Sequence, residues 1–260
     1  MIFVTGDTHG DWMTRLNSHS FPEGVELTKD DYVIICGDFG LWHDTKEERH
    51  NLEWLDNKPF TTLFVCGNHE NYDRLYEYPV EEWNGGKIHK IRDSTFHLMR
   101  GQVFDIQGKK FFTFGGASSH DVQDGILKQD DPRINEWYRD YDKMFRINHT
   151  SWWKEELPSE EEMTEGMMNL KQNGLQVDYI ITHSPYASVL CQMDQGSRLS
   201  EKVRHEHPGD ERLPGALSAG ALDDPSTQGN AGKQAAGFAC PDRRAPRIHG
   251  LHRLETGILR

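Results

Sequence analysis

Three short apolar runs in the first part of the chain each end in a glycine followed by polar residues. The runs span residues 2–5, 32–36 and 60–65, and their content of β-branched and aromatic side chains predicts buried strands. The turns that follow them are Gly6-Asp7-Thr8-His9-Gly10, Gly37-Asp38-Phe39-Gly40 and Gly67-Asn68-His69-Glu70. Because the carboxyl ends of parallel strands meet at one edge of an open sheet, we expect these polar side chains to lie close together.

Helical patterns separate the predicted strands. Residues 44–57 place Leu52 and Leu55 on one face and charged residues on the other, which is typical of a helix that covers a sheet. Residues 11–18 predict a shorter helix whose N-terminus faces the first polar turn. This alternation predicts a βαβαβ opening with parallel strands.

A different pattern begins near residue 87. Four short strands are predicted at 87–91, 95–99, 102–106 and 109–114, with a hairpin turn at Gln107-Gly108. We expect this antiparallel section to form a second sheet packed on the first.

A capping box predicts the last clear helix. Ser159 is the expected N-cap and Glu162 its partner, and the helix continues to about residue 174 with three methionines that we expect in the core. It leads into a strand at 177–182 that ends at His183. The acidic, aromatic segment 122–157 before this helix either covers the polar edge as a lid or simply packs down on the domain.

Composition limits the class of protein. The chain has 260 residues and a formal net charge of -13, which argues against a nucleic-acid substrate because proteins that bind nucleic acid usually present a basic groove. No apolar run approaches the ~20 residues that span a bilayer, and no leader pattern is seen, so we expect a cytoplasmic protein without a membrane partner. The spacing of the cysteines indicates buried thiols. Nothing in the sequence indicates the oligomeric state.

The composition changes toward the C-terminus. Residues 208–260 are roughly two-fifths Ala, Gly and Pro with little apolar periodicity, so we expect them to be poorly ordered. We therefore divide the chain into a domain at residues 1–207 and an atypical tail at residues 208–260.

The three polar turns, together with Thr182-His183-Ser184-Pro185, resemble the ordered motifs of the calcineurin-like metallophosphoesterases. The resemblance covers roughly residues 1–200. It implies an α/β fold of the αββα sandwich type, with mixed sheets flanked by helices.

The motifs supply carboxylate, carboxamide and imidazole ligands, a mixture that suits Mn²⁺, Fe or Zn²⁺ without selecting among them. The resemblance implies two divalent metal ions, with Mn favoured. It places Asp7 and His9 on one ion and Asn68 and His183 on the other, with Asp38 as the bridge.

The resemblance also implies a reaction. A water shared by the two ions supplies hydroxide near neutral pH, and the hydroxide attacks phosphorus in line. His69 then fits a general acid that protonates the leaving oxygen. A simpler alternative is that His69 and Glu70 merely cap the next helix.

Two motifs of the family are not matched. The second turn continues as Gly40-Leu41-Trp42 where protein Ser/Thr phosphatases of the family have Asp-Arg-Gly, so a protein phosphatase is disfavoured. The closing Gly-His-x-His turn is also missing. Its candidates, His205 with His207 and His249 with His252, follow no apolar strand, and an altered reading frame near residue 200 would account for that.

Two functions therefore remain open. The first is a phosphoesterase that hydrolyses a phosphomonoester or phosphodiester bond of a small or nucleotide-like substrate. The alternative is a degenerate, non-catalytic member of the family that binds metal or a phosphorylated ligand but lacks the closing histidine pair.

Overall fold

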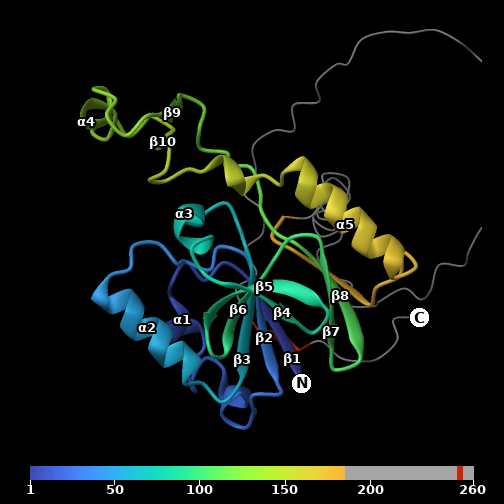
Figure 1. Cartoon of the computed structure of the whole chain (residues 1–260). Coiled ribbons are helices and arrows are strands. Elements are labelled where there is room, and N and C mark those ends of the chain that lie inside the picture. Colours follow the sequence, from blue (N-terminus) through green and yellow to red (C-terminus); the bar gives the residue numbers. More distant parts are fainter. Residues whose placement is uncertain (185–250, 254–260) are drawn as a thin grey trace, which may run out of the picture. The chain divides into compact units, whose positions relative to one another are not determined.

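The computed structural model describes residues 1–184 and 251–253, all within one of the two compact units into which the chain divides (Figure 1). Its larger sheet has the strand order β12-β1-β2-β3-β6-β5-β4. The strands are β1 (Ile2–Thr5), β2 (Tyr32–Cys36), β3 (Thr61–Val65), β4 (Val80–Trp83), β5 (Gly86–Arg92), β6 (Thr95–Leu98) and β12 (His252–Arg253). Neighbours among β1, β2, β3 and β6 are parallel, so the predicted parallel core is confirmed.

The smaller sheet has the order β11-β8-β7 and consists of β7 (Gln102–Ile106), β8 (Lys109–Phe114) and β11 (Tyr179–Thr182). Gln107 and Gly108 form the predicted hairpin turn between β7 and β8, with φ angles of 53° and 74°. Positive φ at both central residues is the geometry that two-residue hairpins favour.

The expectation that residues 87–114 all belong to the second sheet is wrong. Strands β5 and β6 extend the larger sheet, where β6 pairs in parallel with β3. All four residues of β6 are buried, and a strand buried on both faces is stable inside a large sheet. The intervening segment, with α3 (Tyr72–Leu75) and β4, provides the crossover that a parallel pairing requires.

Two apolar cores fix the layers. One lies between the sheets and includes Ile34, Leu63 and Phe111. The other lies on the opposite face of the larger sheet, where α1 (Trp12–Arg15) and α2 (Lys46–Asp56) contribute Trp12 and Leu52. Helix α5 (Glu160–Gln172) packs on β7 (Figure 1). The αββα sandwich is therefore confirmed, although α1 is shorter than predicted.

Helix α5 begins with the predicted capping box of Ser159 and Glu162. Its methionines are not in the core, because Met163, Met167 and Met168 are each about half exposed. The helix is buried at Gly166 instead, where an added Cβ would lie 3.0 Å from Gly101 Cα. Close backbone packing at Gly166 therefore turns the methionine side of the helix outward.

The remaining elements are short. They are the 3₁₀ turns η1 (Pro22–Val25) and η2 (Lys154–Glu156), helix α4 (Ile134–Trp137), and the parallel strands β9 (Gly125–Leu127) and β10 (Phe145–Ile147). Among the described residues, no helix is long and apolar enough to cross a bilayer.

Strand β12 is the described part of the C-terminal region. His252 pairs with Val4 and Arg253 with Phe3, at the edge of the larger sheet, and Leu251 packs against the core beside α1 and α2. The candidate closing residues His205, His207 and His249 lie outside the described residues.

A pair of buried histidines connects β5 and β6. The Nδ1 atoms of His89 and His97 are 2.9 Å apart. Burial lowers the pKa of His89 to about 4, and burial, the neighbouring His89 and Arg100 hold the pKa of His97 well below its ordinary value. Both rings are therefore neutral in the folded protein across the neutral range.

This pair predicts loss of stability in mild acid. Below about pH 6.5 these histidines bind protons in the unfolded chain but not in the folded chain, so their contribution to the free energy of unfolding falls as the pH drops from about 6.5 toward 4. The buried Glu70 acts in the opposite sense, so the contribution of the pair is the difference between the unmodified protein and its histidine variants. We expect His89 alone to contribute about 2–3 kcal/mol. Urea unfolding of metal-free protein between pH 7.5 and pH 4.5 measures this loss. A His89→Gln variant should show a smaller pH dependence, whereas the exposed-site variant His19→Gln should not; equal slopes in all three proteins would contradict the assignment.

Candidate metal centre

The turns after β1 and β2 pack closely against each other and are joined by backbone hydrogen bonds. Asp7, His9 and Asp38 have φ angles of 42°, 47° and 49°, a region that residues other than glycine rarely adopt. The backbone N–H of His9 donates to the carbonyl of Asp38 at 2.7 Å. This close approach requires glycine at position 40, because a Cβ there would lie 2.0 Å from the backbone nitrogen of Gly10.

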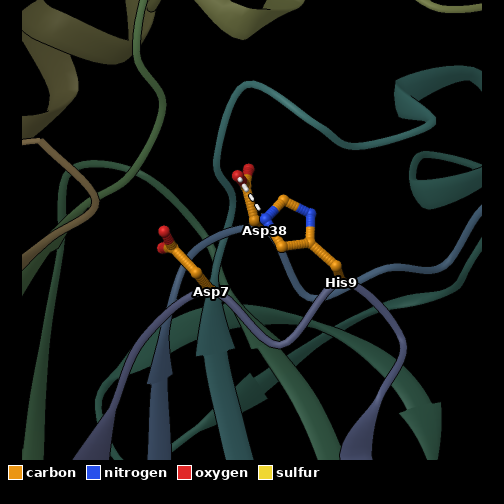
Figure 2. Close-up of side chains that lie close together, drawn as sticks. All are labelled: Asp7, His9 and Asp38. Atoms are coloured by element: carbon orange, nitrogen blue, oxygen red, sulfur yellow. Dashed lines mark ion pairs between the residues drawn. The ribbon is translucent and has the colours of Figure 1, made fainter. Parts of the chain in front are cut away.

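These two turns bring three potential metal ligands close together. One ligand atom from each of Asp7, His9 and Asp38 lies within 4.8 Å of the other two. Figure 2 shows the carboxylates of Asp7 and Asp38 pointing the same way, with the imidazole of His9 beside Asp38. Nε2 of His9 is 3.5 Å from Oδ2 of Asp38, and Asp38 is only 4% exposed. The sequence predicted this grouping.

His183, from the fourth motif, also lies beside Asp38, although it follows a strand of the smaller sheet. His183 follows β11, and its Nε2 lies 3.6 Å from Oδ1 of Asp38. Its Nδ1 is 2.8 Å from the carbonyl of Cys36, which accepts a hydrogen bond from it. In the neutral ring this fixes the proton on Nδ1 and leaves Nε2 with a free lone pair, as a metal-binding histidine requires.

Asn68, in the turn after β3, faces His183. Its Oδ1 lies 3.2 Å from Nε2 of His183, while its Nδ2 donates to Oγ of Ser119 at 3.4 Å. Ser119 is held in turn by the buried carboxylate of Glu156. Two acceptor atoms that face each other at this distance repel unless a cation or a proton lies between them. The donor set around Asp38 therefore fits divalent metal ions.

Ser119 orients the Asn68 amide without being a proposed ligand, so a change at Ser119 tests whether that orientation matters for metal binding. In a Ser119→Ala variant Asn68 loses the partner that orients its amide, and we expect Mn²⁺ affinity to fall about 10–100-fold. Calorimetric titration of metal-free protein measures the change. Ser118→Ala, which alters an exposed neighbour, is the matched control. Unchanged affinity in Ser119→Ala would remove Ser119 from this role.

His69 lies next to the same cluster. Its backbone N–H donates to Oδ1 of Asp38 at 2.9 Å, and its ring lies 5.3 Å from that of His9. It caps no helix, because the N-cap of α3 is Asn71. The capping interpretation also fails for Glu70, whose buried carboxylate instead accepts from the backbone N–H of Phe39 at 2.8 Å. Burial, reinforced by Asp38, raises the pKa of Glu70 to about 8.

The structure adds Arg146 to the site, which sequence reasoning missed. Arg146 lies in β10, inside the segment predicted as a lid, and its NH2 is 3.3 Å from Nε2 of His69. Asp121 holds the guanidinium through an ion pair of 2.6 Å. Burial and then the charge of Arg146 lower the pKa of His69, while Asp38 opposes them. Because a guanidinium only donates, Nε2 of His69 accepts and the ring proton is on Nδ1.

No curated protein and no solved structure matches the chain. A sequence model of the calcineurin-like phosphoesterases matches residues 1–187, the part of the chain that contains all four motifs. By this match, and with the sandwich and the Asp7, His9 and Asp38 cluster that the fold assembles, the chain belongs to the calcineurin-like phosphoesterase family.

Proposed function

We propose that this protein is a metal-dependent phosphoesterase that hydrolyses a phosphomonoester or phosphodiester bond of a small or nucleotide-like substrate. The observation that carries the proposal is the convergence of acceptor atoms around Asp38 at one sheet edge. Phosphoesterase activity is the general property of the family, and the cluster supplies what a divalent cation needs. The net charge of -13 favours a small substrate over a nucleic acid.

Two ions are proposed rather than one, because the two oxygens of Asp38 face different ligands. Oδ2 faces His9, and Oδ1 faces His183. We therefore assign Asp7 and His9 to one ion, Asn68 and His183 to the other, and Asp38 to both. Mn²⁺ is our first choice, with Fe or Zn²⁺ as alternatives, since the ligand types suit all three.

Divalent ions held by these residues would supply positive charge for the phosphoryl oxygens and would make a water a stronger nucleophile. The chain adds two groups beside them. Arg146, held in place by Asp121, is proposed to bind a phosphoryl oxygen, as a guanidinium does well. His69 is proposed to act as the general acid: once the substrate phosphate has drawn Arg146 away, Nε2 takes up a proton from solvent, because a charge that lowers its pKa has moved, and passes this proton to the leaving oxygen.

Arg146 can be tested by itself. An Arg146→Ala variant should keep its metal content and lose about 10–100-fold in kcat/KM, because a charge-assisted hydrogen bond to phosphate is lost. Steady-state kinetics with an aryl phosphate measure the loss. The exposed-site variant Arg139→Ala should match the unmodified protein. Loss of metal in Arg146→Ala would instead point to a structural role.

The function itself is tested by reconstitution. Protein stripped with a chelator should hydrolyse neither p-nitrophenyl phosphate nor bis-p-nitrophenyl phosphate, and Mn²⁺ should restore at least one of the two activities. The ratio of the activities then separates monoester from diester chemistry. Metal binding without hydrolysis of either substrate would favour the degenerate, non-catalytic alternative.

A further inference from the structure

A cavity is lined by residues other than those of the proposed metal centre. Its volume is about 580 Å³, and its walls come from β5, β6, η2 and the start of α5. None of the seven proposed site residues lines it. Met99 and Leu157 give it an apolar surface, while His97 and Glu155 are among its polar residues. A cavity of this size, in which polar side chains are set in a lining whose exposed surface is mainly apolar, is typical of a small-molecule site.

Two polar atoms in this lining have no partner among the described residues. They are Nε2 of His97 and Oε2 of Glu155, and both atoms are buried. The whole of His97 is only 2% exposed. Buried polar atoms in native proteins are nearly always hydrogen-bonded, since leaving one unpaired is costly. A partner of complementary chemistry is therefore expected inside the cavity.

His97 is positioned by its contacts with a neighbouring ring, that of His89. Its Nδ1 is engaged with Nδ1 of His89, and the two rings stack at 5.2 Å. Tyr76 also stacks on His89, at 5.6 Å, and is 45% exposed. Nε2 of His97 is thus the ring atom left for a ligand. It donates or accepts a hydrogen bond according to which histidine holds the shared proton.

The charged groups of the lining do not favour an ionic ligand. Arg100 lines the cavity, but its guanidinium already donates to the Gly115 carbonyl, to Tyr72 and to Glu162. The lysine of the lining, Lys154, has a side chain that is 81% exposed, and the unpaired oxygen of Glu155 repels an anion. A cation would face the guanidinium of Arg100, which already pairs with Glu162. An uncharged ligand that offers an N–H group satisfies Glu155 without either conflict.

We propose that this cavity binds an uncharged planar nitrogen heterocycle of the nucleobase class, with an N–H group donated to Glu155 and a second polar atom paired with His97. Such a ring carries N–H donors and ring-nitrogen or carbonyl acceptors, the two kinds of group that Glu155 and His97 lack as partners, and its faces suit the apolar residues Met99 and Leu157. The site is independent of the proposed phosphoesterase function, because it needs neither metal nor phosphate.

The test uses the full chain, stripped of metal, with adenine and cytosine as probes and inorganic phosphate as the anionic comparison. Binding is measured by calorimetry, together with ¹⁵N spectra of the histidine side chains. We expect at least one base to bind saturably, with the Nε2 signal of His97 moving and those of His69 and His183 unchanged. Phosphate should not compete.

The variant Glu155→Gln should weaken binding at least about tenfold, because a charge-assisted hydrogen bond is lost. Glu161→Gln, the same change at an exposed residue of α5, should bind like the unmodified chain. Absence of saturable binding by either base, or a shift confined to His69 and His183, would overturn the proposal. The spectra of the unmodified protein decide the question even if Glu155→Gln does not fold.

Discussion

Replacing Asp38 by Asn should abolish nearly all hydrolysis, with a loss of at least about 10³-fold in kcat, because Asp38 is placed between the two ligand sets. Its Oδ1 and Oδ2 face His183 and His9, and a neutral amide offers one poor acceptor where the carboxylate offers two. The variant should also bind fewer than two metal ions per chain. Metal analysis after dialysis and turnover of an aryl phosphate give the two readings.

The control for this variant is Asp73→Asn, which removes a carboxylate that contacts His149 and Trp153 away from the site. It should retain both metal and turnover. Two ions per chain together with unimpaired turnover in Asp38→Asn would remove Asp38 from the bridging role. Loss of activity in both variants would indicate a general sensitivity of the fold.

Replacing His69 by Ala should leave metal content near normal and lower kcat by about 10²–10⁴-fold, the usual contribution of a positioned general acid. The loss should shrink for esters with acidic leaving groups, since these depart without a proton. A series of aryl phosphates measures this dependence.

The contact between His69 and Arg146 allows the acid role of His69 to be separated from a positioning role. If His69 only positions the guanidinium, His69→Ala and Arg146→Ala should have similar effects and the double variant should be no worse than either. A constant loss across all leaving groups would therefore count against the acid role.

The sequence predicts those parts of the fold that depend on local pattern. Residues 2–5, 32–36 and 61–65 are strands because short apolar runs end in glycine turns, and the hairpin at Gln107 and Gly108 depends on turn chemistry alone. The capping box at Ser159 is equally local. Such features need no knowledge of distant partners, so they can be predicted from the chain itself.

Features that depend on pairing across the chain could not be predicted in the same way. The sequence pattern of a strand does not indicate which strand will pair with it. The placement of β5 and β6 in the larger sheet therefore required the three-dimensional structure. Arg146 contacts His69, which is 77 residues away in the sequence. The only sequence signal for this contact was the interpretation of residues 122–157 as a lid. The outward methionines of α5 follow from the contact of Gly166 with Gly101, which periodicity does not reveal.

The most direct test of a dinuclear, metal-dependent phosphoesterase is a stepwise titration of the metal-free chain with Mn²⁺, with bound metal and hydrolysis of p-nitrophenyl and bis-p-nitrophenyl phosphate followed in parallel. The proposed mechanism predicts two bound ions per chain and hydrolysis that rises mainly with the second. Saturation at one ion, or two bound ions without hydrolysis of either ester, would contradict it.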